Sequence, residues 1–365
     1  MQRIIYISFL FVSLLLSCQQ EYNYTITGKL QNASDSLVFV SFYGQEKIDT
    51  ILCEKGEFSI KGNVDSLTYL TILIPETGIW LDVWVKKDDK LTLNGDVHFP
   101  DLISIKGNDI NEKLTSFKTS NKTLLQEKAD LFRLQQESEK DTLLDNANEL
   151  SYAVKITNIE YQLAEKAEEF IKNNPSSTAS LTLIRDYLVD PENSNKMEEH
   201  LSLIQTPATE SHLYNYLNAL LEKIKRTAVG SPAPDFQITD IKGDTLSLSN
   251  FQDKYLLLTF AASWCDVCRK DNKSLVNAYT KFKNKGLQMF TVSFDEEKED
   301  WKQAAKEDKI TWLQAIDTQG WGAKMLITYN ISSIPSNFLI DKEGVIIDRN
   351  LFGEALEEAL KELYK

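Results

Sequence analysis

The chain has 365 residues, with 54 acidic and 40 basic side chains and a formal net charge of −14 at pH 7. Such a negative balance excludes nucleic acid as an expected partner and opposes docking on anionic lipid through charge alone. The hydrophobic content of 42% is that of a folded protein. Because the length exceeds what one compact core usually holds, two or more domains are expected.

The first 17 residues have the pattern of a secretory signal peptide. Positive Arg3 is followed by residues 4–16, which are nearly all apolar. As a helix they reach roughly 20 Å, well short of the roughly 30 Å core of a bilayer. The run Leu15-Leu16-Ser17-Cys18 resembles the bacterial lipobox, whose cysteine is diacylated and becomes the new N-terminus. This resemblance predicts removal of residues 1–17 and a lipid on Cys18; an ordinary signal peptide is the alternative.

Gln19 indicates which membrane would hold the lipid anchor. An aspartate after the lipidated cysteine would resemble the signal that retains lipoproteins in the inner membrane. Glutamine there favours the outer membrane of a Gram-negative bacterium, with the protein facing the periplasm.

Residues 24–105 alternate in short apolar runs divided by turn-like pairs such as Lys55-Gly56 and Asn94-Gly95. This alternation predicts a small antiparallel, β-sandwich-like domain over residues 18–107. Trp80 and Trp84 are expected to supply one core and one rim side chain; an aromatic binding face is the alternative. The region also resembles a β-sandwich of unknown function found in lipoproteins of Gram-negative bacteria, on the evidence of Gly28, Gly56-Glu57-Phe58 and Ile105-Lys106-Gly107.

Four cysteines, Cys18, Cys53, Cys265 and Cys268, are too few for a disulfide-stapled scaffold. Cys53 falls in an expected strand and has no second cysteine in its domain. It is predicted to be a buried, unpaired thiol, and a third redox cysteine is the alternative. No metal site or cofactor is expected, because ligand spacing is absent among the three histidines, His98, His200 and His212.

Residues 108–228 change to a helical period. Between Tyr152 and Phe170, apolar residues recur every three or four positions, which predicts a helix with one apolar face. Asn173-Asn174-Pro175 predicts the end of that helix. Nothing catalytic is evident in this region. Two prolines at residues 232 and 234 then open an extended segment, and a new domain is expected over residues 229–365.

The informative motif follows an apolar run at residues 256–261. Ser263-Trp264-Cys265-Asp266-Val267-Cys268 opens an amphipathic segment, which predicts a strand, a turn and a helix that starts with Cys-x-x-Cys. The free N–H groups and the positive dipole end of that helix stabilise a thiolate at Cys265. Two intervening residues let Cys268 reach the Cys265 sulfur. A thiolate here can attack a partner disulfide and be resolved by its neighbour.

Residues 229–365 resemble the membrane-tethered periplasmic thioredoxins of the TlpA type. The resemblance implies an α/β thioredoxin-like fold and a thiol-disulfide oxidoreductase acting on protein thiols or disulfides of the envelope. It also implies that Pro335 is a cis-proline facing the cysteines, and that Trp264, Ile334 and Pro335 contact substrate. The matching pieces are Gly230-x-x-Ala233-Pro234-Asp235-Phe236, Ala262-Ser263-Trp264-Cys265-x-x-Cys268-Arg269, residues 287–294 and residues 334–344.

Three positions depart from the family pattern. Thr259 replaces the buried acid of cytosolic thioredoxins, and Lys273 stands where a helix-kinking proline is usual. Asp271 stands where the TlpA-like branch often has a glutamate. It is expected either to relay the proton of Cys268 or to be a solvated acid favoured by the helix dipole.

The residues beside the cysteines favour a reductase or a weak isomerase. A negative charge at Asp266 opposes a neighbouring thiolate and makes the dithiol less oxidising, with Arg269 expected to offset part of it. Ile334 also resembles the reductive relatives.

Two other functions compete. A thiol peroxidase needs Pro-x-x-x-Thr-x-x-Cys, and residues 258–264 lack that proline and threonine at the required spacing. A non-catalytic binding or envelope-assembly lipoprotein with a vestigial thioredoxin domain is the other alternative, against which the retention of both cysteines argues.

Overall fold

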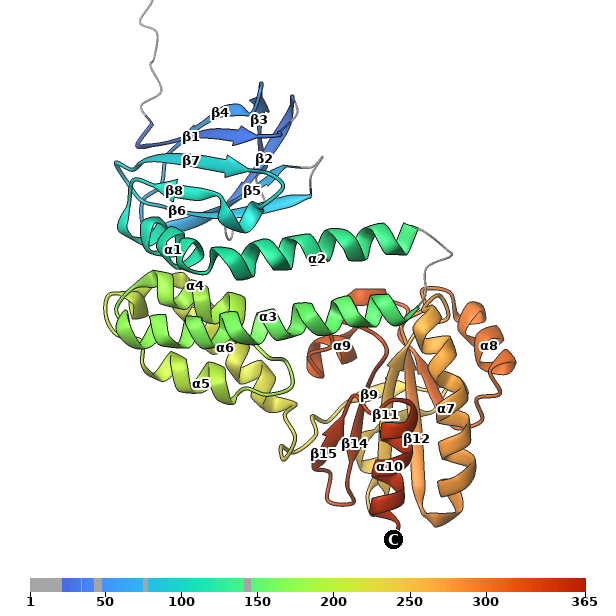
Figure 1. Cartoon of the computed structure of the whole chain (residues 1–365). Coiled ribbons are helices and arrows are strands. Elements are labelled where there is room, and N and C mark those ends of the chain that lie inside the picture. Colours follow the sequence, from blue (N-terminus) through green and yellow to red (C-terminus); the bar gives the residue numbers. More distant parts are fainter. Residues whose placement is uncertain (1–21, 34, 43–47, 75–77, 141–145) are drawn as a thin grey trace, which may run out of the picture. The chain divides into compact units, whose positions relative to one another are not determined.

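The computed structural model describes residues 22–33, 35–42, 48–74, 78–140 and 146–365 (Figure 1). Cys18 and the expected signal peptide lie outside the described residues. The chain divides into two compact units, Met1–Leu163 and Ala164–Lys365. In the part of the chain that is described, no helix is both long enough and apolar enough to cross a membrane.

Two four-stranded sheets build the first unit, with strand orders β4-β1-β7-β8 and β3-β2-β5-β6. Neighbouring strands are antiparallel, as predicted, except that β1 and β7 run parallel. The long chain between β1 and β7 permits this parallel pairing, which a short hairpin cannot make. The strands are β1 (Tyr24–Gln31), β2 (Ser36–Phe42), β3 (Ile48–Cys53), β4 (Glu57–Gly62), β5 (Thr68–Ile74), β6 (Ile79–Val85), β7 (Lys90–Asp96) and β8 (Ser104–Lys106).

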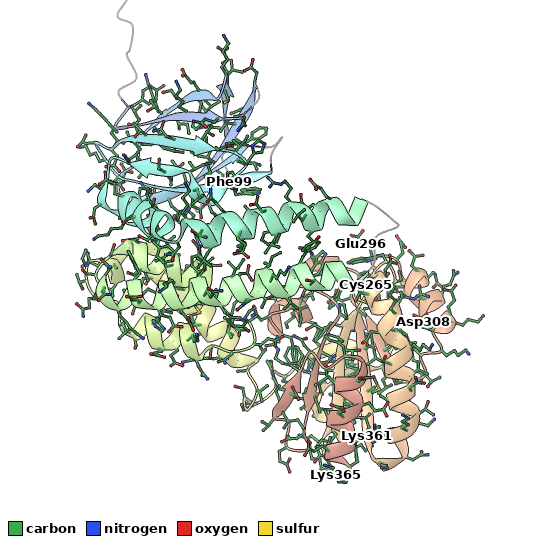
Figure 2. The ribbon with its side chains drawn as sticks, in the orientation of Figure 1. Phe99, Cys265, Glu296, Asp308, Lys361 and Lys365 are labelled. Carbon is green, nitrogen blue, oxygen red and sulfur yellow. A yellow bond between two sulfur atoms is a disulfide. The ribbon has the colours of Figure 1, made fainter. Side chains whose placement is uncertain are left out.

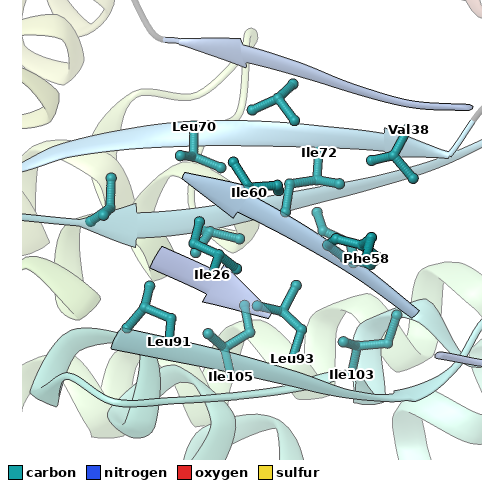
Figure 3. Packing of buried hydrophobic residues seen from close by; sticks show 14 of the residues in the cluster. Ile26, Val38, Phe58, Ile60, Leu70, Ile72, Leu91, Leu93, Ile103 and Ile105 are labelled. Atoms are coloured by element: carbon teal, nitrogen blue, oxygen red, sulfur yellow. The ribbon is translucent and has the colours of Figure 1, made fainter. Parts of the chain in front are cut away.

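The two sheets share one apolar core (Figure 3). Ile26 and Ile60 enter it from one sheet, and Leu70 and Ile72 enter it from the other; all four are almost fully buried. Burying such a side chain stabilises the fold by about 1.5–3 kcal/mol. Cys53 is part of the same core and is 1% exposed, so the predicted burial of this thiol is confirmed.

Trp80 and Trp84 divide between rim and core. Trp84 is buried, while Trp80 is 65% exposed. The buried Asn111 amide donates to the Trp84 carbonyl at 2.7 Å and accepts from the Trp84 N–H at 3.1 Å. The core-and-rim interpretation is therefore confirmed, and the two rings do not form one aromatic face.

Helices follow, as the sequence predicted. The long α3 ends just before Pro175, which cannot continue the helical hydrogen bonds. Ser177 caps α4, since its hydroxyl accepts from the Ala179 N–H at 3.3 Å. The helices are α1 (Asp109–Ser120), α2 (Lys122–Lys140), α3 (Asn146–Asn173), α4 (Thr178–Tyr187), α5 (Asn195–Ser202) and α6 (His212–Arg226).

A five-stranded sheet of order β13-β12-β11-β14-β15 forms the centre of the C-terminal region. β11, β12 and β13 run parallel, whereas β14 and β15 are antiparallel to their neighbours. A short hairpin of β9 and β10 precedes the sheet. The elements are β9 (Gln237–Thr239), β10 (Thr245–Ser247), β11 (Tyr255–Ala261), α7 (Asp266–Phe282), β12 (Leu287–Ser293), α8 (Lys298–Glu307), β13 (Leu313–Ile316), α9 (Lys324–Thr328), β14 (Ser336–Ile340), β15 (Ile346–Arg349) and α10 (Gly353–Leu363).

The central strand β11 is buried on both faces, which explains its continuous apolar run. Leu258 and Phe260 pack on the face that α9 covers, and Leu257 and Ala261 pack on the face that α7 and α10 cover. Helices on both faces of this mixed sheet give the α/β architecture that the sequence predicted (Figure 1).

Candidate active site

Cys265 and Cys268 lie where β11 passes into α7, and they form a disulfide with an S–S distance of 2.06 Å. Cys265 is the N-cap residue of α7, and its Sγ accepts from the Cys268 N–H at 3.1 Å. The Cys265 sulfur therefore meets the first free donors and the positive end of a 17-residue helix. Cys265 is 9% exposed and Cys268 is 2% exposed.

The proline loop lies directly beside this disulfide. The Ile334–Pro335 peptide bond is cis, as the resemblance implied. β14 begins at Ser336, which pairs with Phe260 of β11, so the proline loop and the cysteine loop leave adjacent strands at one edge of the sheet. The Ile334 carbonyl oxygen lies 3.9 Å from the Cys265 Sγ.

Asp271 shares a small cavity with Cys268. The cavity has a volume of about 10 Å³, close to the smallest space that holds one water molecule, and Pro335 and Phe352 also line it. Burial raises the pKa of Asp271 above its ordinary value, although the Gly353 N–H donates to the carboxylate and opposes this shift. A water molecule in this cavity would connect the carboxyl group to the buried sulfur.

Thr259 lines the same cavity at the position of the missing acid. It is buried, and its hydroxyl lies 2.6 Å from the Thr291 hydroxyl, to which the Trp312 indole N–H donates at 2.8 Å. Asp271 is thus the residue that contributes a carboxylate to the lining of this cavity. Thr259 contributes a hydroxyl group that is already hydrogen-bonded to Thr291. Lys273 is exposed two turns into α7.

Asp295 is a residue of the site that the sequence interpretation missed. Its buried carboxylate accepts from the Ser263 N–H at 3.0 and 3.2 Å, and from the hydroxyls of Ser263 and Ser293. It follows β12, the parallel neighbour of β11. A polar side chain after a buried parallel strand points to the edge where ligands usually bind, and this signal was present in the sequence.

Arg269 forms ion pairs with two carboxylates. Its guanidinium binds Asp308 through two hydrogen bonds of 2.5 and 2.9 Å and Glu307 through one of 2.9 Å. Hydrogen bonding to Asp308 is the largest cause of an Arg269 pKa above the ordinary value. Because these two carboxylates balance its charge, little of that charge is left to offset the exposed Asp266.

Aromatic side chains border the disulfide on its solvent side. Trp264 is 57% exposed, and its ring centroid lies 6.5 Å from that of Trp321, which is 55% exposed. The sequence analysis named Trp264 as a substrate contact but did not single out Trp321, which lies 57 residues beyond it along the chain. Ile334 packs partly buried between the two cores of the domain.

Two family models match the chain. The AhpC/TSA family matches residues 229–349, and a domain of unknown function, DUF4369, matches residues 24–114. The thiol-disulfide oxidoreductase ResA of Bacillus thuringiensis subsp. konkukian is 32% identical over 143 residues, which are 39% of this chain and 80% of that protein. This chain belongs to the thiol-disulfide oxidoreductase family.

Solved structures of thiol-disulfide oxidoreductases are also similar to the C-terminal region. The thioredoxin domain of one from Bacteroides vulgatus is 36% identical, covers 38% of this chain and 99% of its own, and has a TM-score of 0.36. Another, from Bacteroides fragilis, is 38% identical, covers 36% of this chain and 99% of its own, and has a TM-score of 0.35.

Family membership confirms the predicted class of activity and the predicted thioredoxin-like fold. This thiol-disulfide oxidoreductase carries a cysteine pair at a helix start, a cis-proline beside it and a carboxyl group behind the second cysteine. Such an arrangement can stabilise a thiolate, receive a disulfide and remove a proton from the second thiol.

Proposed function

We propose that this oxidoreductase reduces disulfides of other envelope proteins by a dithiol mechanism in which Cys265 attacks and Cys268 resolves. The observation that carries the proposal is the position of the Cys265 sulfur at the start of α7, where the Cys268 N–H donates to it at 3.1 Å. A donor there stabilises the thiolate of Cys265. The lower exposure of Cys268 makes it the resolving thiol.

Reduction of the partner takes two disulfide-exchange steps. In the dithiol form, the Cys265 thiolate attacks one sulfur of the partner disulfide, a mixed disulfide forms, and the other partner sulfur leaves as a thiolate. Cys268 then loses its proton and attacks the Cys265 sulfur. This step forms the Cys265–Cys268 bond and releases the reduced partner. Two electrons and two protons from a dithiol donor of the envelope restore the starting form.

Asp271 acts in this proposal as the base for Cys268. The carboxylate and the buried thiol line one cavity with space for about one water molecule, so a proton can pass through that water. Burial raises the pKa of Asp271, which brings the carboxyl group closer to the pH at which a base works well. Its partial burial favours this role over that of a solvated acid at the helix start.

Ile334 and Pro335 receive the partner in this proposal. The Ile334 carbonyl oxygen lies beside the disulfide, 3.9 Å from the Cys265 Sγ. An extended segment of the partner can pair with this backbone as an added strand, which places its own disulfide over Cys265. Trp264, directly before Cys265, contacts the same segment.

The reducing direction is supported by charge. Asp266 is exposed next to Cys265, and Arg269 is held by Asp308 and Glu307. A carboxylate beside the nucleophile disfavours its thiolate relative to the disulfide. The oxidised form is therefore favoured, so the couple donates electrons readily.

We further propose that Cys18 carries lipid after removal of residues 1–17, and that the protein faces the periplasm from the outer membrane. The remaining segments are the β domain at 18–107, the helical region at 108–228 and the thioredoxin-like domain at 229–365. The lipobox-like residues before Cys18 support this anchor. Cys18→Ala should yield a soluble protein in cell fractionation, and continued pelleting with membranes at unchanged size would contradict the anchor.

Trapping in the native envelope tests the cysteine roles. Cys268→Ser should accumulate mixed disulfides with partner proteins, because the attacking thiol remains and resolution is blocked. Cys265→Ser should trap almost nothing, and Cys53→Ser serves as the matched control that changes a cysteine outside the site. Non-reducing gels followed by identification of the captured proteins provide the measurement. Equal trapping by the two active-site variants would overturn the assignment.

A further inference from the structure

Three exposed side chains gather around Cys265 and are called the aromatic rim here: Trp264, Val267 and Trp321. They are 57%, 62% and 55% exposed. Single exposed apolar residues are ordinary, but two exposed tryptophans in ring contact next to a redox disulfide indicate an interaction surface. The ring centroids of Trp264 and Trp321 are 6.5 Å apart, and their planes are tilted by 54°. Because Trp264 directly precedes Cys265, this ring pair lies beside the cysteine turn.

Trp321 reaches this edge through the sheet topology. It lies on a short 3-10 helix (Gly320–Gly322) that follows β13. Because β13 runs parallel to β12 and β12 to β11, their carboxyl ends meet at the edge that carries Cys265. Gly320 has φ 53°, a left-handed conformation that favours glycine and turns the chain so that Trp321 faces solvent.

Carboxylates flank the aromatic rim. Asp266 is exposed between the cysteines, and the exposed Glu296 lies beside the turn that carries Trp321, since a Cβ on Gly320 would stand 3.5 Å from its Oε1. Cys265, Glu296 and Asp308 lie toward one end of the domain, whereas Lys361 and Lys365 lie at the opposite end (Figure 2). Exposed cations are also close in sequence, since Lys324 is three residues from Trp321 and Lys270 is three residues from Val267.

We propose that Trp321 determines specificity, and that the aromatic rim binds an extended polypeptide segment of the partner that carries an apolar side chain next to its disulfide cysteine. This proposal rests on the proposed reduction of protein disulfides. An apolar side chain fits against the two indole rings, whereas an acidic side chain would lose its hydration there without gaining a partner from the rings. The occupant is therefore an apolar, non-acidic segment around a cystine.

The ratio of two rates in the full-length, pre-reduced protein tests the proposal. One substrate is a peptide disulfide with leucine next to each cysteine, and the other is hydroxyethyl disulfide, which has no peptide to bind. Trp321→Ala should lower the peptide-to-small-disulfide ratio of second-order rate constants by about thirtyfold, the size of a weak aromatic hot spot. Trp321→Phe should restore most of the ratio. Trp80→Ala, which removes an exposed tryptophan of the β domain, should leave the ratio unchanged.

A second peptide with aspartate in place of leucine should react about tenfold more slowly with the wild type, because it loses the apolar contact and its carboxylate loses hydration without gaining a partner from the rings. Trp321→Ala should remove most of that preference. An unchanged ratio in Trp321→Ala, or an equal fall with both disulfides, would overturn the proposal. A wild type that reduces neither disulfide would instead overturn the proposed function.

Discussion

Two buried polar side chains, Asn111 in the N-terminal unit and Asp295 in the C-terminal unit, do the same structural work. Each is almost fully buried, and each satisfies the backbone of a neighbouring segment. Asn111 holds Trp84, a core residue at the end of β6, whereas Asp295 holds Ser263, two residues before Cys265. Burial of a polar side chain therefore does not by itself identify a residue of the active site in this protein. What identifies it is the position of the segment that the side chain anchors.

The two regions also differ in their cysteines. The rate at which Cys53 and Cys265 react with a thiol reagent is the largest difference that we expect between the regions. Cys53 is 1% exposed inside the sandwich core, whereas Cys265 is 9% exposed and lies at the start of α7, where the helix N-terminus stabilises its thiolate. Alkylation of Cys53 requires local opening of the domain. In the reduced native protein we expect Cys265 to react on the order of a thousandfold faster than Cys53, as measured by mass spectrometry of timed iodoacetamide labelling.

Cys268 supplies the internal reference in the same labelling experiment, because it shares the domain of Cys265 but is more deeply buried. Its rate should fall below that of Cys265. Rapid labelling of Cys53 would break the comparison and would make it a third redox cysteine. Labelling of Cys268 faster than Cys265 would reverse the proposed roles of the pair.

Replacement of the two buried anchors gives the next largest effect. Asn111→Ala and Asp295→Ala should each lower the free energy of unfolding by about 1–3 kcal/mol. The first removes the side-chain acceptor of the Trp84 N–H, although the Trp84 carbonyl still accepts from Asn108, and the second removes the acceptor of the Ser263 N–H. Urea denaturation measures this loss. Only Asp295→Ala should also slow the reaction of the reduced protein with a peptide disulfide, by roughly 10–100-fold, since the turn before Cys265 loses its anchor.

Asn111→Ala is the matched control for that loss of rate, because it costs similar stability in the other unit. Equal slowing in the two variants would show that stability, and not the position of the cysteine turn, limits the rate. A full rate in Asp295→Ala would show that the Ser263 contacts have no part in placing Cys265.

Much of this site could be predicted because its signals are local in the sequence. The apolar run of β11 and the Cys-x-x-Cys that follows it specify a strand, a turn and a helix N-terminus within about a dozen residues. The same holds for α3, whose apolar stripe and following Pro175 indicated the helix and its end. Alternating apolar residues likewise identified the strands of the sandwich.

The contacts that were missed join residues far apart in the sequence. Asp295 binds Ser263 across 32 residues, and Arg269 binds Asp308 across 39. β1 pairs in parallel with β7, where Thr25 lies opposite Lys90. Local pattern sets which face of an element is apolar, but the choice among distant polar partners depends on the sheet order. That order follows from the packing of the whole core.

Asp271→Asn should give the smallest change in stability of these variants, and this change should depend on pH. The pKa of Asp271 is raised in the folded protein by burial, so the folded state favours the protonated carboxyl group. The stability from that proton is fully present below the ordinary value of 3.8 and is lost as the pH rises through the folded pKa. The amide has no proton to lose, and its oxygen can still accept from the Gly353 N–H.

Asp271→Asn should therefore unfold at a higher urea concentration than the wild type at pH 7, and this difference should close as the pH falls below about 4. Because the amide cannot accept the proton of Cys268, the variant should also resolve mixed disulfides more slowly, with a smaller effect on the first attack by Cys265. Stopped-flow measurement of the first attack and of the resolution step separates the two effects.

Lys273→Gln, which changes an exposed charge nearby on α7, is the matched control. A difference in stability that does not depend on pH, or equal slowing of the two steps, would show that Asp271 is neither a buried acid nor the base for Cys268.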